Sequence, residues 1–436
     1  MSVSSPRHPH PTPSPDPHTA HTAWQAAVPA ISFLLFVSLL RSPITAIPPL
    51  LGRISADLGM NSVEMGALTS VPVLCFGVLT PVASVVMRRL DLNSSALWTL
   101  AIIMAGAIVR STGTIWAAFL GTAVIAAGMT MGNLIAPMVI ARNFRKRTAL
   151  MTGAYSASIN IAVTLSTALA MPLALLIGWQ GSAAAWAIIP GMIVGIVWWR
   201  VFPPHDGRGQ RQDAVTSAPT AAPKLTTISE PAEPSIGNPQ PRARIAAWPL
   251  AWIMATAFAG HNFAYYSTVG WLPTALHDVA GMGESGAGVA SSVFQITAVL
   301  GPMLVPLLMS RFQWPMLRIM IVICASWLTL PFGMLAAPNL WFVWCVFGGM
   351  AQGAFFSALF TVVIQRTRTP DESRRLTALI QTTGYIVAAT GPVLVGHVHD
   401  AVGGWTLPFA IIGVGTIVMT VCGIIAVSDT STPPEK

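Results

Sequence analysis

Residues 33–51 read FLLFVSLLRSPITAIPPLL, an apolar run long enough to cross a lipid bilayer, with one arginine, Arg41, near its middle. A membrane-spanning helix needs about 20 mostly apolar residues. A charge at the bilayer centre costs about 3 kcal/mol or more, so such residues face water-filled cavities or pair with polar groups. Two interpretations of Arg41 follow. It is an anion-attracting group in a central cavity, or a structural arginine bonded to helix carbonyls and neighbouring polar side chains.

The whole chain has the composition of a protein with many membrane spans. Of its 436 residues, 53% are hydrophobic and 9% are charged, whereas soluble domains contain about 25% charged residues. The charges lie in short segments between apolar runs, so the net charge of +8 does not indicate nucleic-acid binding. We expect an all-α protein with twelve transmembrane helices, at residues 24–51, 64–88, 94–112, 115–142, 148–177, 181–201, 247–276, 286–311, 315–335, 339–366, 373–399 and 405–427.

The twelve expected spans form two groups of six. Between them, a segment rich in Pro, Ala, Thr and Gln with scattered charge has the composition of a linker. The predicted organisation is a disordered N-terminal tail at 1–23, an N-terminal half at 24–202, a linker at 203–245, a C-terminal half at 246–427 and a short C-terminal tail at 428–436.

The distribution of lysine and arginine predicts the orientation of the chain. If both termini are cytoplasmic, 20 of the 23 basic residues fall in cytoplasmic segments, with Arg41 in the membrane and Arg53 and Arg110 outside. Cytoplasmic loops of membrane proteins carry an excess of Lys and Arg. We therefore expect a multi-pass protein of the plasma (cytoplasmic) membrane with both termini in the cytoplasm.

The two halves also resemble each other in sequence. Spans 4 and 10 each end in a Val-Ile-x-Arg motif, a basic loop follows each, and spans 5 and 11 each open with Thr-Ala-Leu. Both spans 4 and 10 also carry two glycines four residues apart, a spacing that lets helix backbones approach closely. The paired features are Arg142 and Arg366, Thr148 and Thr377, and the helix-packing glycines Gly128 and Gly132 with Gly349 and Gly353. An internal duplication of six-helix halves is the plan of alternating-access transporters, which bind solute near mid-membrane.

Polar side chains are expected at mid-membrane depth in both halves, judged from the rise of about 1.5 Å per residue. An unpaired polar group in hydrocarbon costs several kcal/mol, so these groups should face one wet central cavity. The candidate solute-binding residues are Arg41, Asn133, Asn160, His261, Asn262, Tyr265, Gln295, Gln352, Gln381 and Tyr385.

The seventh span is the richest in such residues. His261 and Tyr265 are four residues apart and share a helix face, and Asn262 and Tyr266 form the adjacent stripe. The four side chains are interpreted either as hydrogen-bonding and aromatic contacts for a flat, small polar solute or as polar contacts that join helices.

The sequence lacks the motifs of several kinds of chemistry. No carboxylate is expected at mid-membrane, so His261 is the only candidate proton carrier. There is no phosphate-binding loop, no His/Cys/carboxylate cluster with metal spacing and no nucleophile elbow. We therefore expect no metal, no cofactor and no enzymatic activity.

Eight stretches together resemble the major facilitator superfamily and, within it, the cyanate/nitroimidazole transporter family (CynX/NimT type). They cover nearly the whole membrane region: 41–51, 66–81 (GALTSVPVLCFGVLTP), 128–137, 150–160, 271–273, 294–295, 349–353 and 368–400. The resemblance implies the major facilitator fold and secondary transport of a small solute, such as a cyanate-like anion or a small heterocycle. Arg41 matches the family's arginine in helix 1, which implies a substrate or gating role. His261 stands where the family pattern has glutamine.

These observations lead to one main functional hypothesis and two alternatives. The main one is uptake or facilitated passage of a small polar or anionic solute, by a protein expected to act as a monomer in the lipid bilayer. Efflux of drugs or metabolites by the same fold is the first alternative. A membrane receptor or enzyme is the second.

Overall fold

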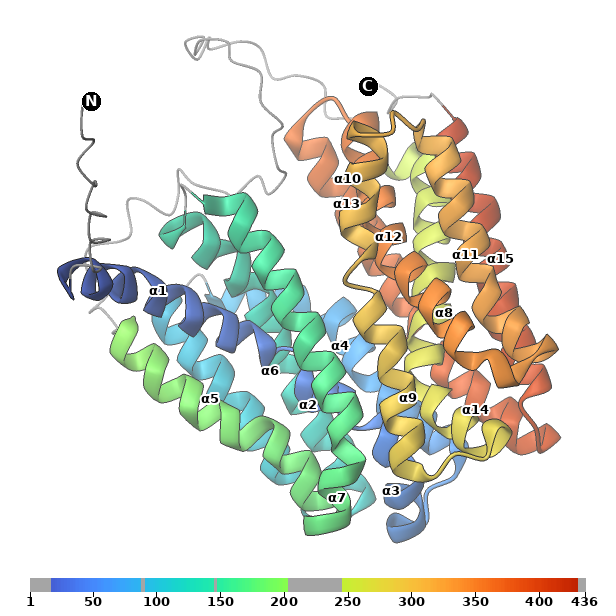
Figure 1. Cartoon of the computed structure of the whole chain (residues 1–436), viewed down its shortest axis with the longest axis horizontal. Helices are drawn as coiled ribbons and strands as arrows, with labels where there is room; N and C mark the ends of the chain where they lie inside the picture. Colours follow the sequence, from blue (N-terminus) through green and yellow to red (C-terminus); the bar gives the residue numbers. More distant parts are fainter. Residues whose placement is uncertain (1–16, 88–90, 145–146, 203–244, 430–436) are drawn as a thin grey trace, which may run out of the picture.

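The computed structural model describes residues 17–87, 91–144, 147–202 and 245–429, and its regular elements there are all helical (Figure 1). The N-terminal half contains α1 (Pro17–Ser38), α2 (Ser42–Thr45), the 3-10 helix η1 (Pro48–Leu50), α3 (Leu51–Leu58), α4 (Ser62–Met87), α5 (Leu92–Arg110), α6 (Ile115–Asn143) and α7 (Thr148–Val201). The C-terminal half contains η3 (Ile245–Ala247), α8 (Pro249–Ala280), α9 (Glu284–Thr297), α10 (Gly301–Ser310), α11 (Met316–Ala336), η4 (Pro338–Leu340), α12 (Trp341–Arg366), α13 (Pro370–Ala388), α14 (Gly391–Val402) and α15 (Thr406–Ser428).

Ten helical segments among the described residues are long and apolar enough to cross a membrane. One of the ten, within α7, holds two spans, because Gly178 adopts φ 76° and ψ 166° and the chain reverses there (Figure 1). The 32-residue helix α8 is not among the ten, and it packs against both α13 and α15 inside the C-terminal half. With α7 counted twice and α8 added, the described chain has the twelve predicted spans.

The first span is a single membrane segment, as predicted, but its helix is broken. Helix α1 ends at Ser38, a turn covers residues 39–41, and the four-residue α2 begins at Ser42. Pro43 has no amide hydrogen and its ring clashes with the carbonyl four residues earlier, so a helix cannot pass through it undisturbed. Arg41 therefore lies at the break, with non-helical angles of φ −137° and ψ −39°.

Spans 8 and 11 are also divided, each at a Gly-Pro pair. Helix α9 ends at Thr297 before Gly301-Pro302, and α13 ends at Ala388 before Gly391-Pro392. The reason is again the missing amide hydrogen and the ring of proline. The spans predicted at 286–311 and 373–399 are present, and each consists of two helices.

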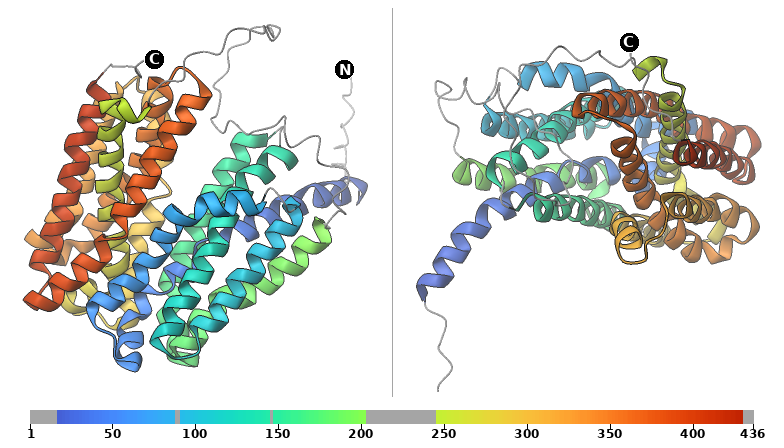
Figure 2. Two further views of the ribbon diagram at one scale, coloured as in Figure 1. Left: turned by 180° about the vertical axis from the view of Figure 1, so that it is seen from behind. Right: turned by 90° about the horizontal axis from the view of Figure 1, so that it is seen from above.

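The two halves meet at one end of the bundle and diverge toward the other (Figures 1 and 2). We call these the closed end and the open end. At the closed end α4 packs against α14, and α7 packs against α9. Two polar side-chain pairs join the halves there. Arg53 Nε donates to Glu284 at 2.9 Å, and the Ser62 amide and hydroxyl both donate to Asp400, the amide at 3.0 Å.

The four glycines expected to allow close helix packing all lie at crowded contacts. A Cβ on Gly128 would lie 2.9 Å from the Ile103 side chain on α5, and one on Gly132 would collide with Leu40. On α12, a Cβ on Gly349 or Gly353 would collide with backbone carbonyls at the end of α9 and just beyond it. A larger residue at Gly349 or Gly353 would therefore push backbones apart, whereas one at Gly128 or Gly132 would first displace a side chain.

Arg110, which the sequence places outside the membrane, is a buried side chain in the structure. It is in the last turn of α5 with only 1% of its surface exposed. Its guanidinium donates to two backbone carbonyls, those of Pro43 at 2.7 Å and Ala183 at 2.8 Å. Arg110 is thus a buried arginine bonded to backbone carbonyls of two other helices.

The predicted tails and linker fall largely outside the described residues. Helix α1 begins at Pro17, so it includes residues 17–23 of the segment expected to be a disordered tail. Residues 1–16, the linker up to residue 244 and residues 430–436 lie outside the described residues.

Candidate functional site

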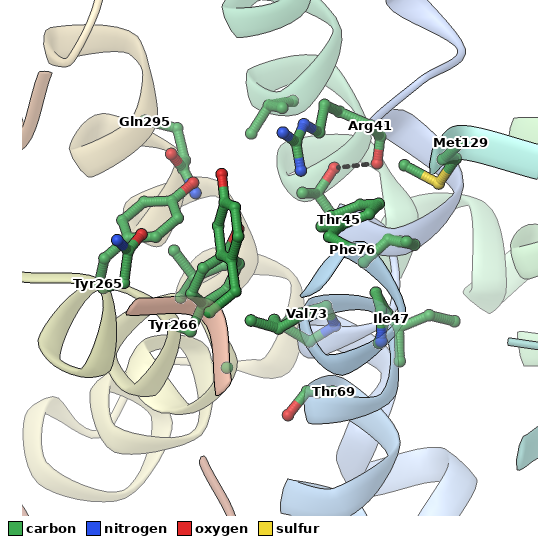
Figure 3. Close-up of a pocket in the computed structure, with 18 of the residues that line it drawn as sticks. Arg41, Thr45, Ile47, Thr69, Val73, Phe76, Met129, Tyr265, Tyr266 and Gln295 are labelled. Atoms are coloured by element: carbon green, nitrogen blue, oxygen red, sulfur yellow. Dashed lines mark hydrogen bonds between the residues drawn. The ribbon is translucent and has the colours of Figure 1, made fainter. Parts of the chain in front are cut away.

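A cavity of about 210 Å³ lies between the two halves. Residues of α2, η1, α4, α6 and α7 line it from the N-terminal half, and residues of α8, α9, α12 and α13 line it from the C-terminal half. Figure 3 shows side chains from both halves facing each other across it. The site is thus built jointly by the halves, as a duplicated transporter plan requires.

Eight of the ten candidate residues line this cavity: Arg41, Asn160, His261, Asn262, Tyr265, Gln295, Gln352 and Tyr385. Asn133 and Gln381 do not. Each lies four residues along its helix from a lining residue, Met129 on α6 and Tyr385 on α13, on the side nearer the open end. Four residues of helix span about 6 Å, so both residues lie about one turn from the cavity.

Arg41 is the only Arg, Lys, Asp or Glu side chain among the residues that line the cavity. Its guanidinium carbon lies 4.9 Å from the centre of the Phe76 ring, a cation–π contact. Figure 3 shows the guanidinium directed across the cavity toward Tyr265 and Tyr266. The break in the first span holds Arg41 here, and Thr45 Oγ1 donates to the Arg41 carbonyl at 3.1 Å (dashed in Figure 3).

All four tyrosines of the chain gather around Arg41. Tyr155, Tyr265, Tyr266 and Tyr385 are each close enough to interact electrostatically with its guanidinium, although they come from three different helices. Tyr155 also stacks on Phe33, with ring centres 6.4 Å apart. Phenol oxygens can accept hydrogen bonds from a guanidinium without neutralising it, so the positive charge remains available to a ligand.

His261 is held in one orientation by Trp327 of α11. The indole nitrogen of Trp327 donates to Nδ1 of His261 at 3.0 Å, and the imidazole stacks on Phe355 with ring centres 4.6 Å apart. An indole N–H can only donate, so Nδ1 carries no proton and the ring proton lies on Nε2. His261 is only 2% exposed, and Nε2–H is the polar group it can offer to the cavity.

The amide side chains differ in how much hydrogen-bonding capacity they leave free. The Asn262 and Asn160 side-chain amides donate to carbonyls of their own helices, at 2.9 and 2.8 Å. Gln295 pairs with the hydroxyl of Tyr265. Gln352 makes no hydrogen bond to any described residue, so its whole amide is available to a ligand.

The sequence analysis missed several residues that complete the cavity wall. Besides aliphatic side chains, they include six aromatic or hydroxyl residues: Tyr266, Phe76, Phe356, Thr45, Thr69 and Thr122. Tyr266 stood out in the sequence as part of the polar stripe on the seventh span, and the rarity of tyrosine was a further signal. The others have no signal of their own, because Phe and Thr are common in membrane helices.

No carboxylate or lysine lines the cavity, and the described residues contain no group of three or more His, Cys, Asp or Glu placed to hold a metal ion. The fold and the site together define a class: a two-half helical membrane protein with a central polar cavity, which is the architecture of a secondary transporter. The chain belongs to the Major Facilitator Superfamily, whose family model matches residues 31–368 and 285–436. It is therefore a membrane transporter and not an enzyme, as predicted.

Three bacterial relatives match most of the chain. The 2-nitroimidazole transporter of Escherichia coli (strain K12) is 30% identical over 403 residues, which cover 91% of this chain and 94% of the relative. The uncharacterized transporter YycB of Bacillus subtilis (strain 168) is 28% identical, with 90% and 92% covered. The cyanate transport protein CynX of E. coli (strain K12) is 23% identical, with 85% and 90% covered.

Solved structures support the fold. A bacterial homologue of the human lysosomal transporter Spinster, in an inward-facing and unoccupied conformation, superimposes with a TM-score of 0.73 at 14% identity, covering 93% of this chain and 97% of that chain. A mutant form of the nucleoside transporter NupG gives a TM-score of 0.67 at 14% identity, with 92% and 99% covered.

Proposed function

We propose that this chain carries a small, polar or anionic solute across the plasma membrane by alternating access, with Arg41 as the residue that attracts and orients it. The observation that carries the proposal is the unneutralised Arg41 guanidinium in a cavity without carboxylates. In a site of low dielectric, a fixed positive charge attracts anions and electron-rich groups and repels cations. A cation-selective drug exporter would need the opposite charge.

The size of the cavity supports a small solute. Its volume of about 210 Å³ is below the range of about 300–1,000 Å³ usual for drug-sized ligands. The relatives are named for 2-nitroimidazole and cyanate, both of which are small and planar or linear and carry electron-rich acceptor atoms. Phe76, Phe356 and the tyrosine rings offer flat faces for such molecules.

The two halves would bind the solute from opposite sides. Arg41 and Asn160 belong to the N-terminal half, and His261, Tyr265 and Gln352 belong to the C-terminal half. A solute that bonds to both halves stabilises the arrangement in which they are close together, so binding is coupled to their rocking.

The charge distribution supports an orientation with both termini in the cytoplasm. The basic residues Arg142, Arg147, Arg311, Arg318 and Arg366 all lie at the open end, whereas Arg53 is the exposed basic residue at the closed end. By the positive-inside rule the open end faces the cytoplasm. The structure would then be the inward-open state of the cycle.

Facilitated passage fits the site better than proton coupling. A proton carrier is usually an intramembrane carboxylate, and none lines the cavity. His261 accepts a hydrogen bond at Nδ1 from Trp327, and a proton on that nitrogen would break the bond. We infer that His261 acts as a neutral donor through Nε2–H.

Replacing Trp327 with phenylalanine should weaken solute binding about two- to tenfold. The change keeps an aromatic ring but removes one neutral hydrogen bond, worth about 0.5–1.5 kcal/mol, and so frees the His261 ring to turn. Trp344→Phe is the matched control, since its indole donates to the Ala337 carbonyl at 2.9 Å and it does not line the cavity. Titration calorimetry measures the solute affinity of both variants. Equal weakening in both would show that Trp327 has no special role.

The substrate class is tested by ligand-induced stabilisation of the purified full-length protein. A ligand that binds only the folded state stabilises it by RT ln(1 + [L]/Kd). We expect cyanate, nitrate or 2-nitroimidazole to raise the unfolding temperature and tetraphenylphosphonium to leave it unchanged. Stabilisation by the organic cation alone would favour drug efflux and refute the proposal.

A further inference from the structure

Arg110 lies outside the cavity, and its burial calls for an explanation. The side chain is 1% exposed, and both acceptors of its guanidinium are neutral backbone carbonyls, those of Pro43 and Ala183. Its Nε has no hydrogen-bond partner among the described residues. Burying a cation without a counter-charge costs several kcal/mol, so this position is not accounted for by stability alone.

The close approach of α5 and α6 dictates where this side chain can go. A Cβ on Gly121 of α6 would lie 2.6 Å from Cα of Arg110, and a Cβ on Gly106 of α5 would lie 2.7 Å from the Ile125 amide nitrogen. The two backbones therefore touch beside Arg110 and leave no room for its side chain on that side. The guanidinium extends instead to α2 and to the second half of α7.

The carbonyl that Arg110 binds on α2 is freed by the break in the first span. In an unbroken helix the Pro43 carbonyl would accept from the Ile47 amide, but that amide donates to Ile44 at 3.1 Å instead. Arg110 Nη1 takes its place at 2.7 Å. Pro43 is two residues from Arg41, so this bond fixes the backbone next to the charged residue in the cavity.

Other bonds to the broken segment are weaker. Thr45 Oγ1 and Ser166 Oγ are 2.7 Å apart, Thr167 Oγ1 donates to the Thr45 carbonyl at 3.3 Å, and Ser42 Oγ donates to the Trp186 carbonyl at a long 3.5 Å. All three join neutral groups, whereas hydrogen bonds from a charged donor are about twice as strong. Arg110 thus provides the strongest hydrogen bonding between residues 39–47 and the surrounding helices.

We propose that Arg110 is the positioning residue for Arg41: it clamps the break in the first span to α5 and α7 and so holds the Arg41 guanidinium over the cavity. The proposal rests on the proposed function in one respect, that Arg41 meets the solute. A displacement of about 1 Å in a binding group can reduce activity up to a hundredfold. Loss of the clamp at the break should therefore weaken solute binding strongly.

Hydrogen–deuterium exchange of the full-length protein in detergent tests the clamp without any solute. In Arg110→Met, amides of residues 39–47 should exchange about tenfold faster or more, as loss of a charged hydrogen bond implies. Arg110→Lys, which keeps the charge and one donor, should show a smaller increase. The matched control is Arg366→Met. Like Arg110, Arg366 donates to a backbone carbonyl, that of Val427 at 2.8 Å, and its Nε has no hydrogen-bond partner among the described residues. Arg366→Met should leave 39–47 unchanged.

Two outcomes of the exchange experiment would overturn the proposal. Unchanged exchange at 39–47 in Arg110→Met would show that the clamp does not hold the break. A uniform increase over the whole N-terminal half would show a general structural role instead.

A double-mutant cycle measured with cyanate and 2-nitroimidazole tests the link to Arg41. Arg110→Met should weaken binding about tenfold beside a wild-type Arg41 and should have no further effect in Arg41→Ala. Equal effects in both backgrounds would overturn the positioning role. If neither probe binds the wild-type protein, the proposed substrate class fails, while the exchange result still decides on the clamp.

Discussion

Arg41→Ala should reduce solute uptake by about 100-fold in cells that hold normal amounts of the protein. Arg41 is the only fully charged group in the cavity wall, and a hydrogen bond to a charged group contributes about 1.5–3 kcal/mol, or roughly a 10- to 150-fold change in binding. Arg41→Lys should be nearly as inactive. Lysine keeps the charge but lacks the planar, forked donors that bind a flat anion and lie over the Phe76 ring.

Uptake of radiolabelled solute into cells or proteoliposomes measures this effect, with protein amounts checked by immunoblot. The matched control is Arg318→Ala. Arg318 also lies over an aromatic ring, 5.7 Å from the centre of Trp314, but it is exposed at the open end, so uptake should stay within a factor of two. Wild-type uptake by Arg41→Ala would refute the central role of this residue.

The arrangement of spans and most of the polar residues that line the cavity could be predicted because hydropathy and depth are properties of local sequence. Twelve apolar runs, a linker and repeated motifs define the two halves without any tertiary information. Polar groups such as His261 and Gln352 stand out in those runs because lipid does not tolerate them. Depth, however, is known only to about a turn, which is why Asn133 and Gln381 were included although they do not line the cavity.

The roles of the two buried arginines could not be separated from the sequence. Arg41 lies in the middle of an apolar run and Arg110 at the end of one, so Arg110 looks like a loop residue. Its burial follows from two tertiary facts, the contact of α5 with α6 at Gly121 and the free carbonyl at Pro43. Neither is visible in one sequence, although Pro43 itself could have indicated that the first span is broken.

The hydrogen-bond partner of His261 could not be predicted from the sequence either. Trp327 is one of 15 tryptophans and lies 66 residues from His261. Only the packing of the helices brings its indole N–H to the imidazole. The tautomer of the histidine, and hence whether it donates to a solute or accepts from it, is therefore a property of the fold.

The polar contacts that join the two halves at the closed end are weak enough to break in each transport cycle. The Arg53–Glu284 pair is 38% and 43% exposed, and such surface pairs contribute about 0–1 kcal/mol. Asp400 accepts from the Ser62 amide at 3.0 Å and from its hydroxyl, and charge-assisted bonds of this kind contribute about 1.5–3 kcal/mol. The sum is similar to the ~5.5 kcal/mol that moves a two-state equilibrium from 1:99 to 99:1.

A disulfide between Ser62→Cys and Asp400→Cys should therefore abolish transport reversibly. If the closed end must open for the solute to cross, a covalent bond between α4 and α14 holds the protein in one state. Uptake into proteoliposomes should fall to background after oxidation with copper phenanthroline and return after dithiothreitol. The variants with only one of the two substitutions, which retain the native cysteines, should show the same uptake before and after oxidation. Undiminished uptake by a double variant shown to be fully cross-linked would mean that the closed end need not open, and alternating access by rocking of the halves would be wrong.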